Sequence, residues 1–358
     1  MNGFKRIIIW ALLSVLMQAA GLLYLDKVYF KQSSDFKVQE PKKEVIPNNV
    51  DLSIPNEATK IESSFDGKYV TYFVENKLYL LDTKNGTSEE IITNDEKREV
   101  LYSKWLSDSN MLTIAEKKVG SSSKKNIVDI LGFTANNKKE KSFTEKGVLI
   151  TYTNGMEIVG IETETKNGVI YIPVNTNGST STIVRRNIDG KFENIPIKNM
   201  TVSELLIYPN KNGDMIYKDK KNNKFYSYSN GKSTIINFTD SNKYELLGID
   251  SKDNVYWGEL GAGDKITKIV YGSIDTKIAT WKTVQLDKGV SKKEIYINNK
   301  NEILVNNSLE GKVKNLTTNV EVSYSGKFIS VNNKVILSKD NDKLYVKNLA
   351  EESNKETK

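Results

Sequence analysis

The chain of 358 residues is 38% hydrophobic and 27% charged, which is typical of a folded body and excludes a globally disordered chain. It contains no histidine and no cysteine, so the usual general base, the commonest metal ligand, thiolate metal sites and disulfides are excluded. The net charge of +7 is spread over single lysines and short pairs such as Lys42-Lys43 and Lys292-Lys293. Nucleic-acid binding needs a clustered basic patch, so we expect no nucleic-acid partner.

The first element is an apolar segment at residues 7–25, within an N-terminal region that we assign to residues 1–30. The segment carries no charge, and as a helix it would measure about 28 Å, close to the thickness of the bilayer core. We therefore expect one transmembrane helix here, with the membrane as a partner. Its expected membrane-interface residues are Lys5, Arg6, Trp10 and Tyr24.

The charges that flank this segment predict its orientation. Lys5 and Arg6 precede it, which favours a cytoplasmic N-terminus and an extracytoplasmic body at the cell membrane. The alternative is a secreted protein whose signal peptide is cleaved near the small residues Ala19-Ala20-Gly21. The apolar run continues beyond that triplet through Leu25, which favours an uncleaved anchor.

Residues 31–57 are predicted to form a linker. They contain Pro41, Pro47 and Pro55, and proline suits an extended tether better than a core element. The last residues, 350–358, form a polar tail.

The body, residues 58–349, is predicted to be all-β. No long run keeps the apolar spacing of an amphipathic helix, whereas short stretches rich in Val, Ile, Tyr and Thr alternate with Asn-Gly, Asp-Gly and Asp-Asn pairs. Asn and Gly tolerate the positive φ that tight hairpin turns require.

These stretches form an internal repeat. Each clear copy has an acidic residue, a short apolar strand, a polar turn and a second strand. The clear copies begin at Glu157, Glu204, Glu245 and Glu294, and the looser ones at Thr59, Glu99 and Val320. A β repeat of about 40 to 50 residues is typical of propeller blades. We expect a β-propeller of six or seven four-stranded blades, with seven favoured.

Two turn motifs resemble a known family. The segment SFDGKYVTY at Ser64 to Tyr72, followed by NKLYLLDTKNG, and the segment WLSDSNMLTI at Trp105 to Ile114 resemble the turns of TolB-like and dipeptidyl-peptidase-N-terminal-like propellers, which are WD-repeat-like. The resemblance implies the propeller fold and a habit of binding proteins or peptides. It implies no catalytic residues.

No motif points to a cofactor or a metal. Serine hydrolase chemistry is excluded because histidine and a G-x-S-x-G elbow are absent, and no P-loop occurs. The acidic stretches Asp250 to Asn254 and Asp340 to Asp342 lie where hairpin turns are expected, so we assign them to turns and not to calcium sites.

Two sets of side chains are candidates for ligand or partner binding. The acidic set, which recurs at equivalent blade positions and so suggests a structural role or a ring of charge, is Glu157, Glu204, Glu245 and Glu294. The aromatic set, which we expect mainly to pack between blades and otherwise to stack on a ligand, is Trp105, Tyr208, Trp257 and Tyr324.

We therefore expect a membrane-anchored extracytoplasmic propeller that binds a protein, a peptide or a wall polymer as a scaffolding module of the cell envelope. One alternative is an envelope glycan hydrolase or lyase that uses Asp, Glu or Tyr in the propeller channel. Another is an accessory subunit whose N-terminal helix itself makes the contacts. An opposed, buried carboxylate pair in the channel would favour the enzyme, whereas carboxylates paired with lysine would count against it.

Overall fold

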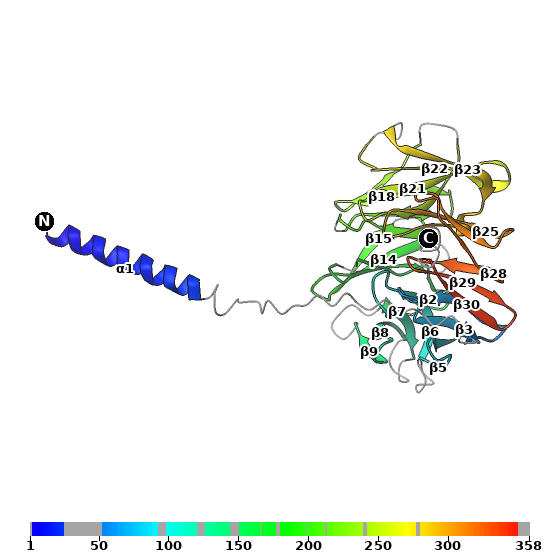
Figure 1. Cartoon of the computed structure of the whole chain (residues 1–358), viewed down its shortest axis with the longest axis horizontal. Helices are drawn as coiled ribbons and strands as arrows, with labels where there is room; N and C mark the ends of the chain where they lie inside the picture. Colours follow the sequence, from blue (N-terminus) through cyan, green and yellow to red (C-terminus); the bar gives the residue numbers. More distant parts are fainter. Residues whose placement is uncertain are drawn as a thin grey trace, which may run out of the picture. The chain divides into compact units, whose positions relative to one another are not determined.

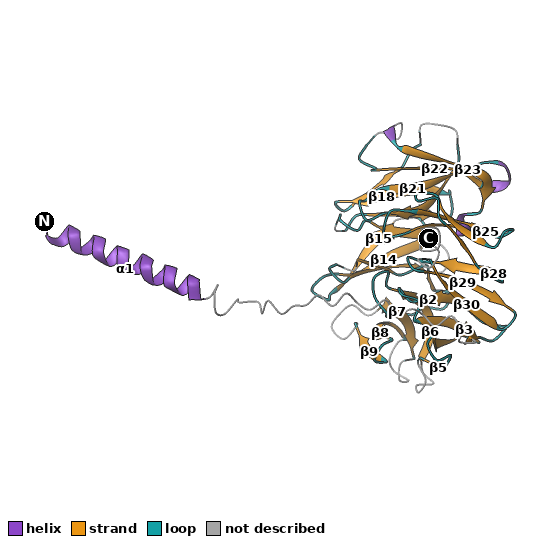
Figure 2. Ribbon diagram, in the orientation of Figure 1, coloured by secondary structure: helices purple, strands orange, loops and turns teal. Residues whose placement is uncertain are grey.

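An N-terminal helix and seven small antiparallel sheets make up the described part of the chain (Figures 1 and 2). The computed structural model describes residues 2–24, 52–91, 98–119, 126–143, 150–164, 166–176, 180–197, 199–211, 213–238, 242–276 and 280–349. Most of the predicted linker and the whole polar tail lie outside these residues.

The helix α1 (Asn2–Tyr24) forms where the apolar segment predicts it. Its large apolar side chains are exposed on all sides, among them Ile9, Trp10, Leu16 and Leu22. In the described residues, however, no helix combines the length and the apolarity of a membrane span. The helix is thus confirmed as a helix, and the predicted transmembrane span is not supported.

The seven sheets are the blades of a propeller, so the seven-bladed alternative is confirmed. Neighbouring strands in each blade pair antiparallel, and in blades 2 and 3 two short strands share one position at the edge of the sheet. Blade 1 contains β2 (Thr59–Ser63), β3 (Tyr69–Val74), β4 (Lys77–Asp82) and β5 (Ser88–Glu90). Blade 2 contains β6 (Arg98–Trp105), β7 (Met111–Lys118), β8 (Ile127–Thr134), β9 (Lys139–Ser142) and β10 (Ile150–Thr151). Blade 3 contains β11 (Glu157–Ile158), β12 (Glu162–Glu164), β13 (Val169–Thr176), β14 (Thr180–Arg186) and β15 (Phe192–Ile197).

The remaining blades follow the same order. Blade 4 contains β16 (Val202–Ile207), β17 (Met215–Asp219), β18 (Lys224–Ser229) and β19 (Lys232–Ile235). Blade 5 contains β20 (Tyr244–Ile249), β21 (Val255–Leu260), β22 (Ile266–Gly272) and β23 (Lys282–Val290), with the 3-10 turn η2 (Ala262–Asp264) before β22. Blade 6 contains β24 (Ile295–Ile297), β25 (Ile303–Asn307), β26 (Lys312–Asn315) and β27 (Glu321–Ser323), preceded by the 3-10 turn η4 (Lys292–Glu294). Blade 7 contains β28 (Lys327–Val331), β29 (Val335–Asp340) and β30 (Lys343–Asn348).

The two ends of the propeller share blade 7. Its outer strand is β1 (Leu52–Ser53), which pairs with β30 through Leu52 and Leu344, so that the first and last strands lie side by side. The Ile54 amide donates a hydrogen bond to the Asp342 carbonyl at 2.9 Å and extends the closure. β1 lies within residues 31–57, which were predicted to be a linker. A strand of two residues is too short to show the alternation of apolar and polar side chains by which a strand is recognised in a sequence.

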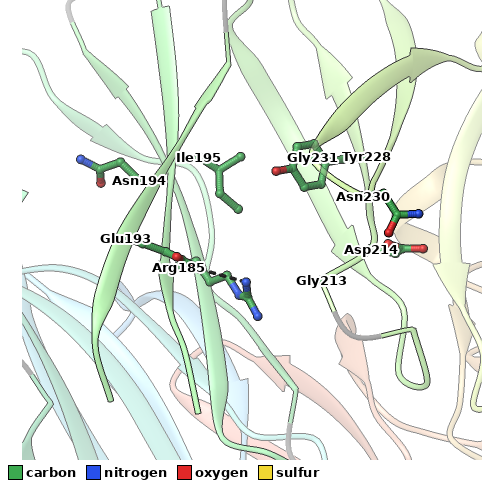
Figure 3. A pocket seen from close by; sticks show the side chains of 9 residues that line it. All are labelled: Arg185, Glu193, Asn194, Ile195, Gly213, Asp214, Tyr228, Asn230 and Gly231. Carbon is green, nitrogen blue, oxygen red and sulfur yellow. Dashed lines mark hydrogen bonds and ion pairs between the residues drawn. The ribbon is translucent and has the colours of Figure 1, made fainter. Parts of the chain in front are cut away.

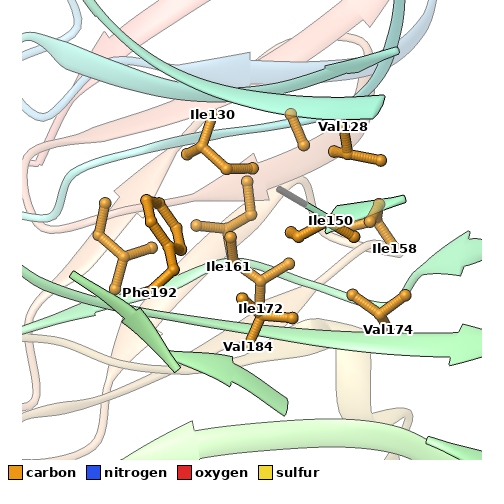
Figure 4. Packing of buried hydrophobic residues seen from close by; sticks show 11 residues of the cluster. Val128, Ile130, Ile150, Ile158, Ile161, Ile172, Val174, Val184 and Phe192 are labelled. Carbon is orange, nitrogen blue, oxygen red and sulfur yellow. The ribbon is translucent and has the colours of Figure 1, made fainter. Parts of the chain in front are cut away.

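Apolar side chains fill all seven interfaces between neighbouring blades with separate clusters. In the interface between blades 2 and 3, Val128 and Ile130 from β8 lie opposite Ile172 and Val174 from β13 (Figure 4). Each blade is therefore buried on both faces, as the alternating Val, Ile and Leu of its strands require.

Blade 2 also buries charge. The side chain of Glu116 is 0% exposed, and its Oε1 lies 3.4 Å from Arg98 Nη1 and 3.7 Å from Lys118 Nζ. Lys118 also pairs with the buried Asp129, while Glu140 lies beside Arg98. Burial raises the pKa of Glu116 from 4.5 to about 7, although the charges of Arg98 and Lys118 oppose the shift.

The closure of the ring can be tested at Ile54, which is buried between blades 7 and 1. We expect Ile54→Ala to lower the free energy of unfolding by about 2–4 kcal/mol, because it leaves a cavity where the chain ends meet. The matched control is Ile188→Ala, at a side chain that is 67% exposed, with an expected change within about 0.5 kcal/mol. Urea unfolding measures both, and equal effects would contradict this account of the closure.

The raised pKa of Glu116 predicts a pH dependence of stability. The pKa of Glu116 is higher in the folded than in the unfolded protein, so its protonation stabilises the fold. This contribution to the free energy of unfolding is fully present below about pH 4.5 and is lost as the pH rises through about 7. We expect Glu116→Gln to raise the free energy of unfolding at pH 8 by about 1–3 kcal/mol and to change it little at pH 5. Exposed Glu321→Gln serves as the control. If both variants keep the wild-type slope between pH 5 and 8, Glu116 is not the responsible group.

Candidate functional site

The first strands of the blades surround the propeller axis, where propellers have a central channel. Neighbouring first strands contact each other, for example β2 with β6 and β16 with β20. Because strands alternate in direction, turns between first and second strands and between third and fourth strands lie on one face, which we call the belt face. The opposite face, where first strands begin and second strands turn into third strands, we call the mouth face.

Turns on the belt face are joined from blade to blade by hydrogen bonds of asparagine, aspartate, serine and lysine. These bonds pass round the ring from blade 3 through blades 4, 5, 6, 7 and 1 to blade 2. They join Lys166 to Asn210, Asn210 to Asp253 and Ser251, Ser251 to Asn301, Asn299 to Asn333, Asn332 to Ser63, and Asp66 to Asn110. The asparagine-rich turns thus brace the ring as well as reversing the chain.

One hydrogen bond on the belt face joins blades that are not neighbours in the ring. Asn333 in blade 7 donates through Nδ2 to the Ser107 carbonyl in blade 2 at 3.2 Å, although blade 1 lies between these blades in the ring. The hydroxyl of Tyr296 in blade 6 donates to Asn333 Oδ1 at 3.4 Å. Turns from three blades therefore meet at this end of the channel.

Near the mouth face, two glutamates and two lysines form what we call the mouth cluster. Lys292 Nζ lies 2.6 Å from both carboxylate oxygens of Glu204 and 3.8 Å from Glu245 Oε2. Lys218 Nζ lies 2.8 and 2.9 Å from the two oxygens of Glu245. All four side chains are partly buried, so each carboxylate is neutralised by a nearby ammonium group.

Closer to the belt face, side chains from four blades form what we call the inner cluster: Glu62 in blade 1, Tyr102 and Lys104 in blade 2, Glu162 in blade 3 and Tyr296 in blade 6. Lys104 Nζ lies 2.5 Å from Glu162 Oε1. Burial lowers the pKa of Lys104, but the charge of Glu162 and this hydrogen bond outweigh burial and leave the pKa raised.

The other titratable groups of the inner cluster respond to burial. Burial raises the pKa of Glu62 from 4.5 to about 6, against the opposing charges of Lys104 and Lys60. Burial raises the pKa of Tyr296 to about 12 and also raises the pKa of Tyr102. The inner cluster therefore contains one carboxylate held by lysine and one carboxyl group with a weakened acidity.

A second concave site lies on the belt face between blades 3 and 4. This groove of about 390 Å³ is lined by Arg185, Glu193, Asn194, Ile195, Gly213, Asp214, Tyr228, Asn230 and Gly231 (Figure 3). Ile195 and Tyr228 come from opposite walls, and Arg185 Nη1 pairs with Glu193 Oε1 at 2.9 Å. The groove is small, and most of its lining residues are polar or charged.

The structure places three of the four candidate aromatic side chains in the blade interfaces. Trp105, Tyr208 and Trp257 are buried, and Trp105 Nε1 donates to Thr71 Oγ1 at 2.9 Å. Tyr324 is partly buried, with its hydroxyl donating to Asn306 Oδ1 at 2.8 Å. The aromatic set thus packs the blades, which was its main expected role, and does not gather on one face.

The four candidate glutamates do not form one ring. Glu204 and Glu245 are joined through Lys292. Glu157 is exposed and accepts a hydrogen bond from Asn175, while Glu294 caps η4 and accepts a hydrogen bond from Ser308. Burial raises the pKa of Glu294, but the bonds from Ser291 and Ser308 outweigh burial and leave it lowered.

The repeat pattern gave no indication of the inner cluster. Glu62 and Lys104 lie two residues before Ser64 and Leu106, whose amides bond to Tyr69 and Met111 across equivalent turns. Aligning the repeat copies on these turns, and not on their acidic first residues, would have placed Glu62 and Lys104 at the same position.

The acidic turn at Asp250 is explained by turn chemistry. The Asp250 carboxylate accepts hydrogen bonds from the amides of Lys252 and Asn254 and from the Tyr256 hydroxyl. Within the described residues, no group of three or more acidic side chains could hold a metal ion.

Sequence comparison finds no relative: no protein-family model matches the chain, and no curated protein matches it. Solved structures do match its fold. An oligogalacturonate lyase from Vibrio parahaemolyticus is 9% identical, with 86% of this chain and 93% of that chain covered and a TM-score of 0.54. A virginiamycin B lyase from Staphylococcus aureus is 14% identical, with 82% and 96% covered and a TM-score of 0.50. YCF48 from Cyanidioschyzon merolae is 10% identical, with 83% and 98% covered and a TM-score of 0.50.

These likenesses show the fold alone, because enzymes and proteins of other kinds share it at low identity. The resemblance to TolB-like and WD-repeat-like propellers is confirmed at the level of a seven-bladed propeller, and the TolB-like family label is not confirmed.

Proposed function

We propose that the propeller is a recognition module that binds a protein or peptide partner and performs no chemistry of its own. The mouth cluster carries this proposal. Glu204 and Glu245 are the two candidate glutamates that come together, and lysine ammonium groups engage both oxygens of each. A carboxylate whose two oxygens are both engaged by lysine has no free oxygen to offer to a substrate.

The same pairing weighs against the carboxylate-based glycan hydrolase or lyase. Such an enzyme needs two carboxyl groups in different environments with space for the substrate between them. In the inner cluster Glu62 has the raised pKa expected of an acid, which favours the enzyme, but its partner carboxylate Glu162 is bound by Lys104. The lyases among the structural neighbours share the fold with this chain, and no catalytic residue is carried over from them.

We place the docking surface on the mouth face. The belt face is occupied by turn-to-turn hydrogen bonds, whereas the turn between β25 and β26 on the mouth face presents Leu309 with 91% of its surface exposed. An exposed leucine at the tip of a rigid turn is a suitable anchor for a partner pocket. Ile188, in the turn between β14 and β15, is an exposed apolar residue on the opposite face.

This pair of residues provides a direct test of the recognition module. A photo-reactive amino acid at position 309 of the full chain should crosslink one discrete protein in living cells, identified by mass spectrometry. The same amino acid at position 188 should not crosslink that protein. Crosslinking of that protein from position 188 alone would reverse the assignment of the face, and no discrete product from either position would contradict the recognition module.

We also propose that α1 holds the chain at a membrane with the propeller on the extracytoplasmic side. Apolar side chains are exposed around the whole helix, which supports this attachment. A helix that is apolar on all sides is stable only where something other than water surrounds it. The exposed ring of Trp10 is suited to the membrane interface, as is that of Tyr24.

Membrane attachment predicts a clear fractionation result. The full chain should remain in the membrane pellet after an alkaline carbonate wash, and a variant lacking residues 2–24 should appear in the supernatant. Protease added outside intact cells should cleave the propeller. The control is Leu309→Ser, which should fractionate like the wild type; release of the full chain by carbonate would contradict the attachment.

A further inference from the structure

The groove between blades 3 and 4 has unpaired polar groups on both of its walls. Asn194 lines it from β15 of blade 3, while Asp214, directly before β17, and Tyr228, on β18, line it from blade 4. Among the described residues, none of these three side chains has a hydrogen bond or an ion pair. Their polar atoms are therefore free to bind a ligand that enters the groove.

The charges in the groove limit the kind of ligand that it can bind. Arg185 Nη1 lies 2.9 Å from Glu193 Oε1, so these two charges neutralise each other. The unpaired carboxylate of Asp214 then makes the groove negative and disfavours an anionic ligand. A single unpaired carboxylate also does not supply the two catalytic carboxyl groups of a glycosidase. The groove is thus suited to binding, and its ligand is neutral or cationic.

The hydrogen-bonding groups favour a neutral ligand with several hydroxyl groups. The Asp214 carboxylate only accepts hydrogen bonds, whereas the Asn194 amide and the Tyr228 hydroxyl both donate and accept. A hydroxyl group can donate to the carboxylate and accept from the amide. An ammonium group only donates, so it would leave the NH₂ group of Asn194 without an acceptor.

Apolar surface accompanies these polar groups. Figure 3 shows Ile195 on one wall and Tyr228 on the other, with the two side chains directed toward each other. Both pack against the apolar cluster between blades 3 and 4. A Cβ atom placed on Gly213 or Gly231 would meet no atom within 4 Å, so open space lies beside both turns. A sugar ring has apolar C–H faces and a polar rim, and an aromatic ring bordered by polar groups matches this pattern.

The size of the groove also fits one sugar ring. Its volume of about 390 Å³ has room for roughly a dozen water molecules at about 30 Å³ each, and a hexose has about as many non-hydrogen atoms. The hydrogen bonds of the belt use none of the residues that line the groove, so the belt leaves it open.

We propose that the groove binds one uncharged sugar ring of a glycan, with the hydroxyl groups of the sugar bonded to Asp214 and Asn194 and a C–H face against Tyr228. The groove lies on the belt face, whereas Leu309 lies on the mouth face. The inference therefore goes beyond partner recognition and does not depend on it.

The test is saturation-transfer NMR of the full chain in a non-ionic detergent that has no sugar head group. The probes are the methyl glycosides of glucose, galactose, mannose and N-acetylglucosamine, and the control is sorbitol, which has hydroxyl groups but no ring. We expect saturable binding of at least one glycoside and no saturable binding of sorbitol. The uronates of glucose and galactose should bind about fivefold more weakly than the parent glycosides, because Asp214 repels a carboxylate.

Variants identify the groove as the binding site. Tyr228→Ala removes the aromatic surface and Asp214→Ala removes the unpaired acceptor, and each should weaken glycoside binding about tenfold. The matched controls lie outside the groove: Tyr345→Ala, at a partly buried tyrosine on β30, and Asp264→Ala, at an exposed aspartate in η2. Both controls should bind the glycoside like the wild type.

Four results would overturn the proposal: no saturable binding of any of the four glycosides by the folded wild-type chain, equal binding of sorbitol, tighter binding of a uronate, or undiminished binding in Asp214→Ala. Circular dichroism establishes that each variant is folded, and Asp214→Ala, in a turn outside the apolar clusters, keeps the test decisive if Tyr228→Ala unfolds. None of these results affects the crosslinking test at position 309, so the failure of this site and the failure of the recognition module are distinguishable.

Discussion

A four-stranded blade has two apolar faces, and both leave contact with water only when another blade lies against each of them. This requirement determines the architecture, because an open row of blades would leave the outer faces of its two end blades exposed. The seven interface clusters show that the blades form a closed ring, in which both faces of each blade lie against a neighbouring blade. The short strand β1 follows from the same requirement, since it joins the two ends of the row at the interface of Leu52, Ile54 and Leu344.

Closing the ring forces polar side chains together near its axis. The apolar residues are used in the interfaces, so charged side chains on the first strands face one another across the channel. Lys292 of blade 6 reaches Glu204 of blade 4 across blade 5, and Asn333 of blade 7 reaches Ser107 of blade 2 across blade 1. Such contacts join blades that are not neighbours in the ring.

The fold was predictable from local sequence because each blade repeats the same physical pattern of β-rich strands and asparagine or glycine turns. The blade number was narrowed to six or seven by the repeat, and seven was favoured. What the repeat could not predict was β1, since its partner β30 is almost the whole chain away and two residues carry no period. The resemblance in the turn motifs led to the correct fold, but residues shared by many propellers do not identify a family.

The candidate site was predictable only in part. Recurrent glutamates identified Glu204 and Glu245, but the repeat could not show that Lys292 joins them, because ion pairs across the channel depend on three-dimensional proximity. Glu62 and Lys104 were missed because the copies were aligned on their acidic first residues. Trp105, Tyr208 and Trp257 lie in blade interfaces, as the preference of Trp and Tyr for strand positions predicts.

The closure by β1 also has a consequence for the order in which the protein can be completed. β1 is synthesised before any blade, and its partner β30 is synthesised after all the others. Leu52 must therefore remain without its partner Leu344 until nearly the whole propeller has been translated. Forming their contact closes the longest loop in the domain. Each interface can form once the next blade has been translated, but the interface between blades 7 and 1 forms late because it depends on both ends of the chain. A chain that ends before β30 would still contain every blade translated up to that point, but its ring would remain open.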